Sequence, residues 1–308
     1  MEKEFEESFN EIYDKIVMSC SDRLKDVKSK NNKFVLGVFI VLAVLNIIIL
    51  CFSNIRGIIS LSVSSSIFLV MFFYITGDGN YKRIYKKCVI EELVKGYNNK
   101  FYYDPNTGIT RIEYNMAHFD EKYDEYRAED RIFGTLEIGD NFQLSEITTL
   151  QVTEIKDSSG RVQKNKKQTF RGMYGIIRLK KNPLLNIHIA SDNFSKKYAK
   201  NRIEMDSSEF EKYYDCLTRD KIDTMRIFTS DLIEKYIEIV RDNKYGFELK
   251  IVDDMIFLRY KTNQVFEPPM FKTGLEKEFL KKNYKVIYYP LEIISATIKN
   301  MNEIMEDK

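Results

Sequence analysis

Apolar and polar residues alternate with different periods in different parts of this 308-residue chain. In residues 1–32 and again in residues 78–96, apolar side chains recur every three or four positions between charged ones, which predicts two amphipathic helices. We expect their apolar stripes to face each other as an intramolecular stalk. An oligomerising coiled coil is the alternative, which periodicity does not separate from the stalk. The stripes are Phe5, Phe9, Ile12, Ile16, Cys20 and Leu24, and Tyr81, Ile84, Tyr85, Cys88 and Leu93.

Two apolar runs lie between these helices, from Phe34 to Phe52 and from Gly57 to Thr76. Neither carries an ionisable side chain apart from Cys51, and each is about 20 residues long, enough to cross a hydrocarbon core of about 30 Å. A buried core helix of a soluble protein is the alternative, but it does not account for two adjacent uncharged runs. The pattern therefore predicts a transmembrane helical hairpin over residues 33–77.

Basic residues flank the predicted hairpin on both outer sides, whereas Arg56 alone lies between the two runs. Because positive charge accumulates on the cytosolic side of a membrane, we expect a two-pass protein of the inner cell membrane with both termini in the cytosol. The lipid bilayer is then its first partner. Residue usage rich in Lys, Asn, Ile and Tyr, without Trp, is typical of a bacterium. The flanking residues are Arg23, Lys25, Lys28, Lys30 and Lys33 before the first run, and Lys82, Arg83, Lys86 and Lys87 after the second.

In residues 97–308 apolar side chains recur mostly at every second position, which predicts a cytosolic domain built on an antiparallel sheet. One hairpin is explicit in FELKIVDDMIFLRY, where Asp253 and Asp254 form a two-residue turn. The register pairs Phe247 with Tyr260, Leu249 with Leu258 and Ile251 with Ile256 on one face, and Glu248 with Arg259 on the other.

Helices are expected near the C-terminal end of this domain. Asp231 and Glu234 form a D-x-x-E capping pattern, and Pro290 opens a last helix whose apolar stripe should cover the sheet. The predicted fold class is α+β, with an N-terminal helix and a two-helix transmembrane hairpin followed by a β-rich antiparallel cytosolic domain with C-terminal helices. The stripe of the last helix consists of Leu291, Ile294, Ile298, Met301 and Met305.

The candidate site lies in a second hairpin. A three-residue loop from Gly139 to Asn141 brings the apolar faces of its strands together and sets Gly134 opposite Glu146. Glu146 is then a carboxylate on the core face, and burial obliges it to find a cation or several donors, or to be neutral. We expect Arg226 and Arg171 as its partners, in a structural ion pair rather than a ligand or catalytic site.

Other candidate chemistry is sparse. Four cysteines, scattered without a C-x-x-C spacing, predict reduced thiols and neither a disulfide framework nor a zinc site. His188 alternates with isoleucines and is expected to pack within a strand, and the sequence holds no phosphate-binding, dinucleotide-binding or hydrolase motif. We therefore expect no catalytic residue, cofactor or metal, and a net charge of +2 gives no reason to expect a nucleic acid partner. The cysteines are Cys20, Cys51, Cys88 and Cys216, and the other histidine is His118.

Four stretches of the predicted cytosolic domain carry a resemblance. EDRIFGTLE (129–137), FRGMYG (170–175), the segment 204–240 and VFEPPMF (265–271) resemble a bacterial membrane-protein family known as domain of unknown function 3137. The pattern includes an acidic-x-x-Arg element, matched by Asp223 and Arg226, whereas Ser230 stands where a helix-opening proline is expected. The resemblance implies an architecture and a membrane location, and it implies no activity.

Three classes of function are compatible with these patterns. The favoured one is a membrane-anchored binding or scaffold module whose cytosolic domain meets a protein partner or anionic lipid headgroups, with homo-oligomerisation left open. The second is a membrane-bound enzyme with a site that no motif reveals. The third is an oligomeric pore, which is disfavoured because the serines of the second run form no single polar stripe.

Overall fold

The computed structural model describes residues 2–52, 79–119, 121–156, 162–191, 202–244, 246–263, 266–269 and 272–306. The chain divides into two compact units. One comprises Met1–Phe9, Val94–Phe266 and Lys281–Lys308, and the other comprises Asn10–Leu93 and Glu267–Leu280.

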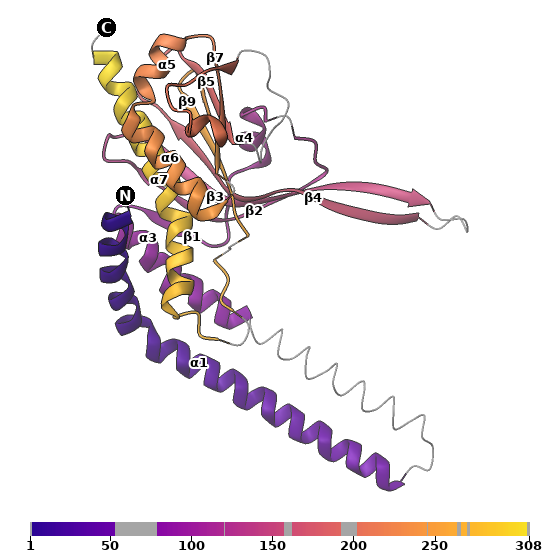
Figure 1. The fold of residues 1–308 in the computed structure, drawn as a ribbon. Coiled ribbons are helices and arrows are strands. Elements are labelled where there is room, and N and C mark those ends of the chain that lie inside the picture. Colours follow the sequence, from indigo (N-terminus) through magenta and orange to yellow (C-terminus); the bar gives the residue numbers. More distant parts are fainter. Residues whose placement is uncertain are drawn as a thin grey trace. The chain divides into compact units, whose positions relative to one another are not determined.

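The first unit is built on an antiparallel sheet, which has nine strands in the described part of the chain (Figure 1). Their spatial order is β1-β2-β3-β4-β9-β8-β5-β7-β6. The strands are β1 (Tyr102–Asp104), β2 (Glu125–Thr135), β3 (Asn141–Lys156), β4 (Val162–Arg178), β5 (Asn186–Ser191), β6 (Arg202–Ile203), β7 (Tyr214–Thr218), β8 (Phe247–Val252) and β9 (Met255–Lys261). The helices are α4 (Arg111–Met116), the 3-10 turn η2 (Phe210–Lys212), α5 (Lys221–Ile227), α6 (Ser230–Asn243) and α7 (Lys277–Glu306).

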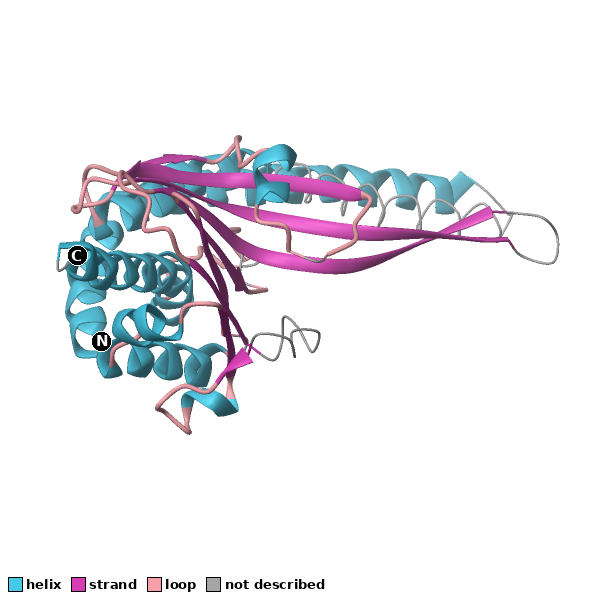
Figure 2. Cartoon of the chain, turned by 90° about the horizontal axis from the view of Figure 1, so that it is seen from above, coloured by secondary structure: helices cyan, strands magenta, loops and turns pink. Residues whose placement is uncertain are grey.

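Both faces of the sheet are covered, because alternate side chains of its central strands are apolar on each side. Helices α6 and α7 lie over one face, where Ile294 of α7 approaches Gly175 of β4 (Figures 1 and 2). On the opposite face, Tyr114 of α4 and Phe119 pack with Tyr174 in a second apolar cluster. The sheet is therefore the middle layer of this unit.

The hairpin of β8 and β9 has the register that alternation predicts. Phe247 pairs with Tyr260, Glu248 with Arg259 and Val252 with Met255, so that Asp253 and Asp254 are the turn residues. Asp253 has φ 53°, the left-handed conformation that aspartate tolerates in tight turns. This prediction is confirmed.

The predicted helix boundaries are wrong. Helix α6 begins at Ser230 with Thr229 as its N-cap, so the D-x-x-E pattern of Asp231 lies inside the first turn. Pro290 does not open the last helix but lies within α7, which begins at Lys277. The helix starts earlier because the buried stripe continues upstream through Leu280 and further aromatic and aliphatic residues.

The register of β2 against β3 also differs from the prediction. Thr135 pairs with Asn141 and Gly134 with Phe142, so the loop consists of the five residues between Thr135 and Asn141 rather than three. Glu146 therefore lies opposite Glu129, beyond a bulge in β2, and not opposite Gly134. The Asp140 carboxylate accepts a hydrogen bond from the Lys180 backbone N–H at 2.8 Å, a contact from outside the hairpin that helps to set the loop.

The second unit contains most of α1 (Glu2–Phe52), the π-helical turn η1 (Lys86–Ile90) and the start of α3 (Glu91–Tyr97). The two predicted stripes meet here, since Lys15 forms an ion pair with Glu92 at 2.8 Å and Cys20 forms a disulfide with Cys88. The prediction of reduced thiols is wrong for this pair, because helix packing brings Cα atoms 68 positions apart in sequence to within 6.0 Å. Cys216 is a free, buried thiol.

The predicted membrane topology is wrong. Within the described residues, no helix combines the length and the apolar character needed to cross a membrane. The run from Phe34 to Phe52 continues the charged first part of α1, and the run from Gly57 to Thr76 lies outside the described residues. Lys86, one of the flanking charges, is 6% exposed and forms an ion pair with Glu267 at 3.0 Å. The α+β fold with a large antiparallel sheet stands, whereas the transmembrane hairpin and the two-pass location in the inner membrane do not.

Candidate functional site

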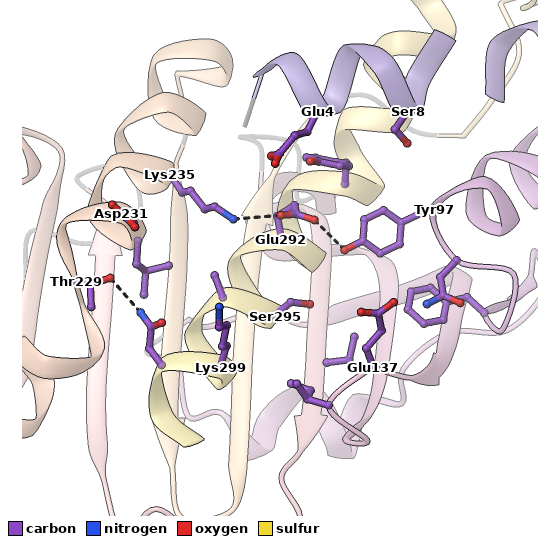
Figure 3. A pocket seen from close by; sticks show the side chains of 18 of the residues that line it. Glu4, Ser8, Tyr97, Glu137, Thr229, Asp231, Lys235, Glu292, Ser295 and Lys299 are labelled. Atoms are coloured by element: carbon purple, nitrogen blue, oxygen red, sulfur yellow. Dashed lines mark hydrogen bonds and ion pairs between the residues drawn. The ribbon is translucent and has the colours of Figure 1, made fainter. Parts of the chain in front are cut away.

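A cavity of about 760 Å³ opens in the sheet-containing unit (Figure 3). Helices α6 and α7 form much of its wall, and the first residues of α1, the end of α3 and the β2–β3 loop complete it. A volume of this size lies within the range of ligand pockets, roughly 300–1,000 Å³. The cavity is therefore the first candidate for a binding site.

Helix α7 supplies a polar and aromatic stripe to the cavity. Tyr284, Tyr288, Glu292, Ser295 and Lys299 follow one another at steps of three or four residues, so they share one face of the helix. The apolar residues of α7 that pack on the sheet occupy another face. The helix thus separates a structural side from a side open to ligands.

Glu292 is the centre of the polar wall. Its carboxylate accepts a hydrogen bond from the Tyr97 hydroxyl at 3.2 Å and forms an ion pair with Lys235 at 3.2 Å, as Figure 3 shows. The Glu292 and Lys235 side chains are each about a quarter exposed, so a solvated ligand can reach both.

The cavity carries an excess of negative charge. Four carboxylates line it against two ammonium groups, and the Lys235 ammonium is already paired with Glu292. Among the described lining residues there is neither a histidine nor a cysteine. The carboxylates belong to Glu4, Glu137, Asp231 and Glu292, and the ammonium groups to Lys235 and Lys299.

Tyrosines form the aromatic part of the wall, and burial raises their pKa. Burial, and after it the Glu292 carboxylate, raises the pKa of Tyr97 far above its usual value, and burial raises the pKa of Tyr284 to about 12. The phenols are therefore neutral hydrogen-bond donors at physiological pH, not bases. Tyr97 and Tyr288 meet edge to face with ring centroids 5.8 Å apart.

The structure brings together two of the three residues of the sequence-predicted site. Glu146 is 6% exposed, and Arg171 Nε lies 3.4 Å from its Oε1 atom. Arg226 lies on α5 instead, where its guanidinium is 3.9 Å from the Asp223 carboxylate.

Two further carboxylates stand near Glu146. Glu129 and Asp130 bring their oxygens, with one from Glu146, to within 4.8 Å of one another, close enough to hold a metal ion. The Tyr103 hydroxyl donates a hydrogen bond to Asp130. Together with Arg171, this contact gives the cluster positive or donor partners from the protein itself.

A buried charge network lies on the sheet face opposite α6 and α7. Arg259 Nε donates to Glu248 at 2.7 Å, and its Nη1 lies 2.6 Å from a Glu121 oxygen. His188 Nε2 lies 2.9 Å from the other Glu248 oxygen, and burial lowers the pKa of this imidazole. Both His188 and Glu248 are buried, so these polar groups pair with one another inside the sheet-containing unit. His188 packs within its strand, as predicted.

Sequence reasoning missed the cavity because no motif marks it. The signal that could have found it is the polar and aromatic spacing from Tyr284 to Lys299, which is visible once α7 is known to begin at Lys277. Tyr97 and the β2–β3 loop reach the cavity through tertiary folding and carry no local signal.

A family model described as "Protein of unknown function (DUF3137)" matches residues 168–299. No curated protein and no solved structure matches the chain. The matched family is uncharacterised, and the match covers 132 of the 308 residues, less than half of the chain. It covers Lys235 and Glu292 and ends before Asn300, and it does not cover Tyr97.

Proposed function

We propose that this protein is a binding module whose cavity receives a positively charged segment of a partner protein. The observation that carries the proposal is the composition of the wall, with four carboxylates and several tyrosine rings against two lysines. Carboxylates and aromatic faces are the groups that hold ammonium and guanidinium side chains.

A cationic side chain would bind by competing with Lys235. Glu292 is held by Tyr97 and Lys235, so its carboxylate is oriented before any ligand arrives. An incoming ammonium group can take the place of Lys235 on Glu292 while the Tyr97 hydrogen bond remains. The cavity volume exceeds that of one lysine or arginine side chain, which favours a segment over a single group.

The positions of these groups favour binding over catalysis. Lys235 and Glu292 stand on helices packed on a sheet, and elements of this kind hold a binding site rigidly. The phenols stay protonated because their pKa values are raised, so they offer hydrogen bonds and ring faces and no base.

The test measures binding of a fluorescein-labelled peptide, KSKSKS, to the full chain by fluorescence anisotropy at low salt. Glu292→Gln should weaken binding about tenfold, equivalent to about 1.4 kcal/mol. Lys235→Met should strengthen it several-fold, because the competing internal cation is gone. Glu303→Gln, an exposed carboxylate on the same helix outside the cavity, is the matched control and should bind as the unmodified chain does.

Two results would contradict the proposal. One is an equal loss of peptide binding in Glu292→Gln and Glu303→Gln, which would show only a general effect of net charge. The other is equal binding of the peptide ESESES, which a cavity rich in carboxylates should reject.

A further inference from the structure

Strands β3 and β4 form a ribbon that continues beyond the rest of the sheet (Figures 1 and 2). They have 16 and 17 residues, whereas an average strand has about five or six. Pairing of β3 with β2 ends at Leu150, and pairing of β4 with β9 ends at Gly172. The two strands remain paired with each other as far as Lys156 and Val162.

Neither face of the ribbon is covered. All side chains of β4 from Val162 to Gln168 are exposed, as are Gln151, Thr153 and Glu154 of β3. A two-stranded ribbon without a buried face gains little free energy from apolar burial. What the ribbon offers is backbone hydrogen-bonding groups along its edges.

The two edges of the ribbon differ. On the β3 edge, the Asp124 carboxylate already accepts the Val152 backbone N–H at 2.6 Å. On the β4 edge, the last backbone hydrogen bond on the side of β9 runs from the Thr262 N–H to the Arg171 carbonyl oxygen. Within the described residues, no strand lies alongside residues 162–168 on this side. The β4 edge therefore offers the longer stretch for a further strand, residues 162–168 against residues 153–156 on the β3 edge.

The β4 edge is basic. Lys164, Lys166 and Lys167 lie within residues 162–168, and this stretch of β4 contains no acidic residue. Lys164 forms an ion pair with Glu154 at 3.4 Å, and Lys166 forms one with Glu125 at 2.5 Å. All four side chains are at least a third exposed, and exposed ion pairs of this kind contribute only about 0–1 kcal/mol. Lysines on a strand edge repel basic segments and attract acidic ones, which supplies specificity.

We propose that the β4 edge over residues 162–168 binds an extended acidic segment of a partner protein by strand addition. Main-chain hydrogen bonds to β4 provide the register, and carboxylates on alternate residues of the segment face Lys164 and Lys166. This surface is separate in chemistry from the acidic cavity, since it selects the opposite charge.

The experiment uses the full chain and a fluorescein-labelled acidic peptide, TETEVET, with TKTKVKT as its matched control. The triple variant Lys164→Glu, Lys166→Glu, Lys167→Glu should weaken binding of the acidic peptide at least tenfold. The matched variant Lys212→Glu, Lys221→Glu, Lys282→Glu makes the same change of net charge at exposed lysines off the ribbon and should retain binding. Circular dichroism spectra of both variants check that the fold is retained.

Strand addition has its own readout. Amide hydrogen exchange over residues 162–168 should slow when the acidic peptide is bound, because the edge N–H groups gain partners. Binding without slower exchange, equal losses in the two triple variants, or tighter binding of a labelled 18-base-pair DNA duplex than of the peptide would each overturn the proposal. Glu292→Gln should leave the acidic peptide unaffected, so this test stands apart from the test of the cavity.

Discussion

Removal of the Arg259 charge should destabilise the sheet-containing unit more than removal of an exposed arginine. In Arg259→Met the stem keeps a similar length, but Glu248, which is 0% exposed, loses the guanidinium that donates to it at 2.7 Å. An uncompensated buried charge costs about 3–5 kcal/mol. Because His188 still lies 2.9 Å from Glu248, we expect a loss near the lower end, about 3 kcal/mol at pH 7.

The loss of stability in Arg259→Met should be smaller in mild acid than at neutral pH. Burial raises the pKa of Glu248, but the charge of Arg259 and the hydrogen bond with His188 hold it below its ordinary value. The unmodified protein therefore has the full stabilisation above the pKa of this carboxyl in the unfolded chain and loses it as the pH falls through the lower folded value. Without Arg259 burial dominates, Glu248 takes up a proton in mild acid, and the difference between the two proteins should shrink at pH 5.

The assay is urea denaturation of the full chain followed by circular dichroism at pH 7 and pH 5. Arg178→Met, which removes an exposed arginine from neighbouring strand β4, should change the free energy of unfolding by about 0.5 kcal/mol or less. Combining Glu248→Met with Arg259→Met should recover only the part of the loss that comes from Glu248, because the Glu121 carboxylate, 2.6 Å from Arg259 in the unmodified chain, still lacks its cation. A loss below about 1 kcal/mol at pH 7, or one that does not shrink at pH 5, would refute the reasoning.

Two further outcomes are expected. Gly172→Ala should lower the free energy of unfolding by about 1–3 kcal/mol in the same urea assay, because its Cβ would lie 2.1 Å from the Tyr260 carbonyl oxygen and would push β4 from β9; unchanged stability would show that the strands separate freely. Cys216 should react with iodoacetamide at pH 8 at least about 100-fold more slowly in the folded chain than in urea, because the thiol is buried and burial raises its pKa to about 12. Equal rates by mass spectrometry would contradict its burial.

Local patterns determined the elements whose contacts are close in sequence. In the hairpin of β8 and β9, strict alternation and a two-residue turn leave one register that buries the apolar face, and the structure has that register. Alternation along β3 likewise determines the face of Glu146, because Phe142, Leu144 and Glu146 follow one another at steps of two and therefore share a face whatever strand pairs with them. Glu146 is accordingly buried although its predicted partner across the strand was wrong.

Contacts distant in sequence decided the rest. The loop between β2 and β3 closes on Lys180, and the disulfide joins residues 68 positions apart. A local pattern carries no information about such pairs. The apolar run after Phe34 matched the length of a membrane span, but in the structure it continues a helix that begins at Glu2 in charged sequence.

In the candidate site, too, one part was determined by the local sequence and another by tertiary packing. The spacing from Tyr284 to Lys299 determined that these side chains share one helix face, and this could be read from the sequence. That Tyr97 and Lys235 both meet Glu292 on this face depended on how three helices from different parts of the chain pack in the sheet-containing unit. Packing of this kind is decided by the burial of the other, apolar faces, so the position of the cavity followed from the core and not from the residues that line it.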